Sequence, residues 1–252
     1  MILTLKIRIL LPMLLRLLLM TNVIVVVNSL PAGPSSPVLL IPEDDFTLYN
    51  TSAGTTTQDP RVDSVLTFWF DPRYPYYHWF VADPKFDAEI TTKFASLVTR
   101  ARTTTDLDHW AGSPQGSLAL IVVLDQFPRN MFRKSSEAFT SDQKALSIAG
   151  AAIDRGFDGD LTFVQQVFVY LPYMHMENLP DQDRGVAMYQ SLTARCEAGA
   201  PEKEWLDSCV DFAIRHQKVI AEFGRFPARN EALHRQSTPK ETEFLKTHPW
   251  GY

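Results

Sequence analysis

Residues 113–130 read SPQGSLALIVVLDQFPRN. Ser113 and Pro114 have the order of an N-cap and a first-turn proline, so a helix is predicted to begin there. Residues 118–124 are almost continuously apolar, and Pro128 is expected to end the helix because proline lacks a backbone N–H. This stretch therefore predicts a helix that is buried on most of its sides.

The same helical spacing of apolar residues continues along the rest of residues 61–252. Each further helix should bury one stripe, and the stripes are Val62, Val65, Leu66 and Trp69; Phe86, Ile90, Phe94 and Leu97; Ala145, Leu146, Ala149 and Ile153; Phe163, Val164, Val167 and Phe168; Val186, Tyr189 and Leu192; and Trp205, Cys209, Phe212, His216, Val219, Ile220 and Phe223. No run alternates polar and apolar residues between turns, so no sheet is predicted. The expected fold is all-α, with antiparallel helical hairpins stacked on one another.

Cap and turn residues support these boundaries. Helix starts are expected at Asp83-Pro84, Ser141, Asp160, Pro180, Pro201 and the Thr238–Glu241 capping box, and helix ends at Gly156, Pro172 and Gly224.

Composition limits the classes of partner. The 252 residues carry a formal net charge of −5, with a sequence pI of about 5.7. Because the chain has no excess of Lys and Arg to neutralise phosphates, no nucleic-acid partner is expected.

The N-terminal segment predicts entry into the secretory pathway. Lys6 and Arg8 precede an apolar stretch that Arg16 interrupts and that ends in small residues, which is the order of a secretory signal. Residues 1–29 are therefore predicted to be a signal peptide, with a retained signal anchor, and so membrane association, as the alternative. Residues 30–60 should be a flexible linker, and Asn50 begins a glycosylation sequon. The domain would then be lumenal or extracellular, secreted or membrane-anchored.

The two cysteines allow two interpretations. Cys196 and Cys209 could form a disulfide between neighbouring helices in an oxidising compartment. Alternatively, Cys209 is a small apolar filler on its buried stripe.

Three polar segments follow predicted helix ends. They are residues 125–133, residues 175–177 and residues 223–230 with a later arginine. One interpretation is structural, since arginines at helix C-termini pair with carbonyls and carboxylates. The other is a common site, with candidate catalytic residues Arg129, His175, Glu177 and Arg229 and candidate substrate-binding residues Asp125, Gln126, Asn130, Arg133, Arg225, Asn230 and Arg235. No phosphate-binding glycine loop, nucleophile elbow or metal-ligand pattern occurs, so no cofactor or metal is predicted.

At these segments the sequence resembles the family known as domain of unknown function 924. The resemblance covers residues 61–248 and rests on VLTFWF (65–70), LDQFPRN (124–130), HME (175–177) with DQ (181–182), and FGRFPARN (223–230). It implies a tetratricopeptide-like all-α fold and no established activity.

Three positions depart from the family pattern. Where the family pattern has Ser, His and Gly, this chain has Met176, Ala228 and His234. If relatives use that His as an acid or base, this chain cannot repeat their mechanism unchanged. The substitutions at Met176 and Ala228 make the site less polar, as a pocket for an apolar ligand would be.

Two functions from different classes follow. The first is a cofactor-independent enzyme of specialised metabolite biosynthesis, such as a cyclase, isomerase or pericyclase, acting on a small and largely apolar molecule. The second is a non-catalytic helical-repeat module that binds a peptide or protein partner. An enclosed cavity rimmed by the arginines would favour the enzyme, and an open groove would favour the module.

Overall fold

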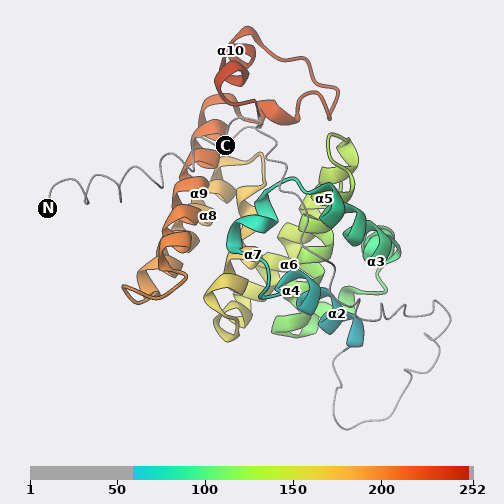
Figure 1. The fold of residues 1–252 in the computed structure, drawn as a ribbon. Helices are drawn as coiled ribbons and strands as arrows, with labels where there is room; N and C mark the ends of the chain where they lie inside the picture. The colour runs from blue at the N-terminus through green and yellow to red at the C-terminus, as the bar shows by residue number, and fades with distance from the viewer. Residues whose placement is uncertain (1–58, 250–252) are drawn as a thin grey trace, which may run out of the picture. The chain divides into compact units, whose positions relative to one another are not determined.

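The computed structural model describes residues 59–249, except for the side chains of Tyr76 and Tyr77. Every regular element in that range is helical, so the predicted all-α class is confirmed. Figure 1 shows the α-helices, which are α2 (Pro60–Trp69), α3 (Pro84–Thr103), α4 (Pro114–Ile121), α5 (Phe127–Met131), α6 (Asp142–Asp154), α7 (Phe163–Met174), α8 (Leu179–Arg195), α9 (Lys203–Phe223) and α10 (Pro239–Thr247).

The predicted signal or anchor segment, nearly all of the predicted linker and the Asn50 sequon lie outside the described residues. Helix α2 begins at Pro60, where Asp59 accepts a hydrogen bond from the Arg61 N–H as its N-cap. Within residues 59–249, no helix has the length and apolar character needed to span a bilayer.

Helices that are close in sequence pack against each other. The contacting pairs include α4 with α6, α6 with α7, α7 with α8, and α8 with α9, as stacked hairpins require. Helix α4 also contacts α2 and α7, and residues 118–124 have no solvent exposure. The helix predicted to be buried on most sides therefore lies at the centre of the core.

The chain stays helical through Pro128, so the predicted helix end there is wrong. Helix α4 continues as a π-helical turn over Val122–Gln126, and α5 contains the proline near its start. Proline has no N–H to give to the Leu124 carbonyl, which accepts a hydrogen bond of 2.6 Å from the Ser141 hydroxyl instead. A side chain from another helix thus replaces the bond that proline cannot make.

Two other predicted boundaries are also wrong. Pro172 lies inside α7 because the surrounding turn is buried in the core, and that packing outweighs the helix-breaking tendency of proline. Thr162, not Asp160, caps α7, and Ser141 occupies the N-cap position of α6 without bonding its backbone. In contrast, Gly156 and Gly224 have the expected left-handed conformation, with φ of 73° and 66°.

The C-terminal segment has a small core of its own. Phe226 packs with Val219 and Ile220 at the end of α9, and Phe223 and Phe244 pack against this cluster. In Figure 1 this segment and α10 lie at one end of the described domain, in red.

Both cysteines are buried free thiols in the structure, so the predicted disulfide is not formed. Burial raises the pKa of the Cys209 thiol to about 12. Cys209 thus corresponds to the alternative interpretation, a small apolar filler.

Candidate functional site

The structure brings together polar residues from three separate segments. His175 is the C-cap residue of α7, and its Nδ1 lies 2.7 Å from Oδ1 of Asp125 in the π-helical turn. Arg229, which follows α9, donates a hydrogen bond of 2.9 Å to the His175 carbonyl. Side chains 54 residues apart in sequence therefore share one centre.

A fourth segment completes this centre. Asp142, in the first turn of α6, accepts two hydrogen bonds of 2.9 Å from Arg129 and lies 3.4 Å from Arg229. We call Asp125, Arg129, Asp142, His175 and Arg229 the central cluster. Two carboxylates face two guanidinium groups, so the cluster is balanced in charge when His175 is neutral.

The His175–Asp125 pair has a defined protonation pattern. Burial alone would raise the pKa of the Asp125 carboxyl, but Arg129 and His175 outweigh it and hold that pKa well below the usual range. Burial and the charge of Arg129 lower the pKa of His175 below its usual value. At neutral pH, an ionised Asp125 therefore accepts the Nδ1–H of a neutral His175, which leaves Nε2 as the basic nitrogen.

The two arginines of the central cluster differ in how fully they are paired. Arg129 bonds the Asp125 carbonyl at 2.7 Å as well as both carboxylates, and these carboxylates keep its pKa raised although burial alone would lower it. The guanidinium of Arg229 lies between the rings of Phe139 and Phe226, 4.6 and 4.5 Å from their centroids. Burial and the charge of Arg129 lower the pKa of Arg229 to about 10. Arg229 is thus the guanidinium with the weaker hold on a carboxylate.

A second set of ion pairs lies beside the central cluster. Glu177 accepts hydrogen bonds of 2.6 and 2.9 Å from Arg235 and one of 2.8 Å from the Phe226 N–H. Arg225 binds both oxygens of Glu241 at 2.6 and 2.8 Å. We call Glu177, Arg225, Asn230, Arg235 and Glu241 the C-terminal clasp, because they fasten the C-terminal segment to the end of α7.

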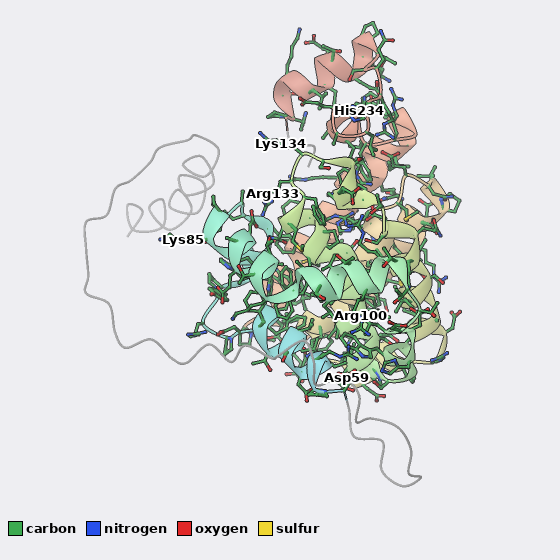
Figure 2. All side chains as sticks on the ribbon, turned by 90° about the vertical axis from the view of Figure 1, so that its right-hand side faces the viewer. Asp59, Lys85, Arg100, Arg133, Lys134 and His234 are labelled. Atoms are coloured by element: carbon green, nitrogen blue, oxygen red, sulfur yellow. The ribbon has the colours of Figure 1, made fainter. Side chains whose placement is uncertain are left out.

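Some predicted site residues do not face His175. Asn130 and Arg133 both donate hydrogen bonds of 2.8 Å to Asp87 on α3, and Figure 2 shows Arg133 at the surface next to Lys134. Asn230 accepts a hydrogen bond from Arg235 within the clasp. The side-chain amide of Gln126 donates a hydrogen bond to the Asp125 carboxylate and thus helps to hold that carboxylate in the central cluster.

Sequence reasoning missed two residues of this centre. Asp142 follows the residue expected to cap α6, so it would be taken for an ordinary acidic residue favoured by the helix dipole. Phe139 lies outside every predicted helix. One signal could have revealed Asp142. Several arginines lie near helix ends, and a buried arginine needs a carboxylate partner, so a nearby aspartate should have been considered.

Two cavities in the described part of the chain are lined by residues outside the central cluster. One, of about 560 Å³, is lined by residues near α2 and the start of α7, including Phe70, Tyr74 and Trp79. The other, of about 400 Å³, lies between Thr99 and Thr140. No group of three or more metal-ligand side chains with suitable geometry occurs within residues 59–249.

Comparison with known proteins identifies the family. A family model described as "Bacterial protein of unknown function (DUF924)" matches residues 65–248. The chain belongs to the DUF924 family. It is similar to a solved structure, a protein of unknown function, ATU0120, from Agrobacterium tumefaciens, with 32% identity, 75% of this chain and 98% of that chain covered, and a TM-score of 0.66. The search of curated proteins gave no match.

One departure from the DUF924 pattern has a backbone consequence. His234, at the position where the pattern has Gly, has a φ of 53°, which is left-handed. Glycine adopts this conformation readily, whereas a residue with a Cβ is strained by roughly 1–2 kcal/mol. A glycine at position 234 would avoid this strain.

Proposed function

We propose that this DUF924 protein is a cofactor-independent enzyme of specialised metabolite biosynthesis that moves a proton on a small, largely apolar molecule. The reaction would be a cyclisation, an isomerisation or a pericyclic rearrangement. The observation that supports this proposal is the buried Asp125–His175 pair, in which Nε2 of the histidine has no hydrogen-bond partner among residues 59–249, together with Arg229, which binds the His175 backbone carbonyl.

In the proposed mechanism, His175 is the general base. Asp125 fixes the ring by accepting the Nδ1–H, and its carboxylate stabilises the imidazolium that forms when Nε2 takes a proton. Because the pKa of His175 is lowered, the base stays neutral at pH 7 and for some distance below pH 6.5. We therefore expect the acid limb of the activity profile to lie below pH 6.5.

The arginines and Glu177 take different roles in this mechanism. Arg229 stabilises negative charge on the substrate, since its closest carboxylate contact is the 3.4 Å one to Asp142. Arg129 is saturated by Asp125 and Asp142 and acts as a positioning residue. Both oxygens of Glu177 are engaged by the C-terminal clasp, so the proton transfer is assigned to His175 alone.

An apolar substrate fits the departures from the family pattern. Met176 and Ala228 stand where the family has a hydroxyl and an imidazole. Met176 lies between His175 and Glu177, and Ala228 directly precedes Arg229. Removing two polar side chains lowers the cost of placing an apolar molecule nearby.

We also propose, from the N-terminal sequence pattern, that the protein enters the secretory pathway. Expression in a eukaryotic host tests this proposal: the mass should fall on glycosidase treatment if Asn50 is glycosylated.

Proton exchange with solvent tests this proposal whatever the product of the reaction is. The full chain is incubated in D₂O with a panel of small enolisable ketones, and loss of the exchangeable C–H signal is followed by NMR. His175→Gln and Asp125→Asn should reduce exchange by at least 100-fold. The matched control is His109→Gln, because Nδ1 of His109 is also held by an oxygen acceptor, the Asp106 backbone carbonyl, but its side chain is 60% exposed. Equal exchange in all four proteins, or none in any, contradicts the proposal.

Two observations favour the second function, a helical-repeat module. The two cavities described above are not lined by the arginines of the central cluster, so neither is the enclosed, arginine-rimmed cavity expected of the enzyme. The arginines of the clasp are bound to carboxylates of the same chain, as they would be if the polar groups only locked helices together. An interaction module needs neither His175 nor a free base. Pull-down of one partner that survives His175→Gln, with no exchange in D₂O, would favour that function.

A further inference from the structure

A second histidine lies at the edge of the central cluster. His216 is half-buried on α9, and its ring packs edge-on against Phe226 with centroids 5.5 Å apart. The face of Phe226 carries the Arg229 guanidinium at 4.5 Å. His216 therefore borders the same aromatic ring that supports the proposed anion-stabilising group.

Both histidines have their proton fixed on the same nitrogen. Nδ1 of His216 lies 2.8 Å from the Phe212 carbonyl, which can only accept a hydrogen bond, so Nδ1 carries the proton. Nδ1 of His175 is held by Asp125 in the same way. Each neutral ring thus keeps its acceptor lone pair on Nε2.

These two acceptor nitrogens are open to a ligand. Within residues 59–249, neither Nε2 has a hydrogen-bond partner, and neither is among the fully buried polar atoms that lack one. Each Nε2 therefore keeps a small exposed surface. A buried acceptor without a partner would be a defect, whereas an accessible one is available for binding.

Burial, helped by neighbouring charges, keeps His216 neutral. Burial lowers its pKa to about 4, and the groups that face it, His175, Arg229 and Arg129, add to the effect, while the hydrogen bond to Phe212 opposes it. Its Nδ1 partner is a carbonyl, not a carboxylate, so an imidazolium at this position lacks the support that Asp125 gives to His175. Consequently His216 suits a hydrogen-bond acceptor and His175 suits a base.

We infer that His216 is the substrate-orienting residue of this site and that the ligand presents two hydrogen-bond donors, one to each Nε2. This inference rests on the proposed function for the role of His175 and adds the substrate class. The ligand is a small hydroxylated compound with a second acidic proton, such as a dihydroxyaromatic or an enolisable hydroxy ketone. Its hydroxyl binds His216, its acidic proton passes to His175, and the resulting negative charge lies near Arg229.

The experiment measures binding directly. Full-length protein with ¹⁵N-labelled histidine is titrated at pH 7 with catechol, resorcinol, phenol and anisole, which offer two, two, one and no O–H donors. The Nε2 signals of His175 and His216 should shift with the same Kd for at least one of the diols. Phenol should bind more weakly than that diol, and anisole should shift neither signal.

Variants separate a ligand contact from a structural role. His216→Gln and His175→Gln should each weaken diol binding by about 3- to 10-fold, the size of one neutral hydrogen bond, and His109→Gln should leave it unchanged. In the D₂O assay with an enolisable hydroxy ketone as substrate, His216→Gln should raise KM and leave kcat within about threefold. His175→Gln should abolish kcat.

Failure of this inference differs from failure of the proposed function. If the His216 signal stays unmoved while that of His175 shifts, or if neither shifts with any probe, the inference is overturned. Exchange activity that depends on His175 but not on His216 also overturns it and leaves the proposed enzyme intact. Coupled shifts without any D₂O exchange support the two-histidine site and count against catalysis.

Discussion

The central cluster and the C-terminal clasp use the same residue types in different ways. In the clasp, Glu241 and Glu177 are each bound by the fork of one arginine and by a backbone N–H. In the central cluster, by contrast, two carboxylates and two arginines accompany a histidine whose Nε2 has no hydrogen-bond partner in the described part of the chain. A set of charges that is fully paired can hold helices together, whereas a set that leaves one basic atom open can also act on a ligand.

Burial makes this difference stronger. Asp125 is fully buried and the Asp142 side chain is only 10% exposed; in the clasp Glu241 is comparably buried, at 3%, but Glu177 and Arg235 keep 24% and 23% exposure. Charges in the cluster are therefore less screened by water, and each depends more on its partners. The following predictions test this contrast.

The largest effect is expected when the central cluster loses a carboxylate. Asp142→Ala leaves Arg129 and Arg229 without a shared partner, so we expect a loss of about 3–5 kcal/mol in the free energy of unfolding. Glu177→Ala in the clasp should cost about 2 kcal/mol, because Arg235 can reach water. Urea denaturation measures both, and equal losses would remove the distinction between the two regions.

The π-helical turn that carries Asp125 gives the next prediction. Ser141→Ala leaves the buried Leu124 carbonyl without its hydrogen bond, so the protein should lose about 1–3 kcal/mol. Ser147→Ala, at an exposed position on the same helix, is the control and should change little. If both variants are equally stable, Ser141 does not support the turn beneath the central cluster.

Acid titration separates the two regions by pH. Burial lowers the pKa of His216 to about 4 from 6.5, so its contribution to stability is complete above pH 6.5 and is lost as the pH falls to 4. Hydrogen bonds from Arg225 lower the pKa of Glu241 to about 2 from 4.5, so its contribution is lost between pH 4.5 and 2. His216→Gln should flatten the first range and Glu241→Gln the second, as measured by unfolding at fixed pH values. A single range affected by both variants would contradict this assignment.

The sequence predicted the helices well because burial of a helix leaves a local pattern. The spacing of Val62, Val65 and Trp69, for example, follows directly from one buried face. Pro128 and Pro172 misled that reasoning because other helices compensate for the missing backbone hydrogen bond. At Pro128 the Ser141 hydroxyl bonds the Leu124 carbonyl, and at Pro172 burial of the turn in the core outweighs the loss. Local patterns cannot report such tertiary compensation.

The site was predicted in its parts but not in its pairing. Helix-end arginines and His175 could be selected from the sequence, yet the partner of each arginine depends on how the hairpins pack. Arg133 binds Asp87, while Arg129 binds Asp142, although Arg129 lies in α5 and Arg133 only two residues beyond its end. His216 was assigned to the core because its stripe is apolar, and only the structure shows that it reaches the ring beneath Arg229.

The smallest effect concerns the backbone beside the clasp. His234 precedes Arg235 and has a left-handed φ of 53°, and Lys134 has one of 63°; Figure 2 labels both residues. His234→Gly should raise the free energy of unfolding by up to about 1 kcal/mol, because relief of the strained conformation outweighs the added freedom of the unfolded chain. Differential scanning calorimetry measures the rise in Tm, and Gln236→Gly, at an exposed position nearby, is the control without a gain. Because His234 precedes Arg235 of the clasp and does not belong to the central cluster, diol binding should be unchanged in this variant. A stability gain accompanied by weaker binding would mean that the two regions are coupled, and the clasp would then belong to the site.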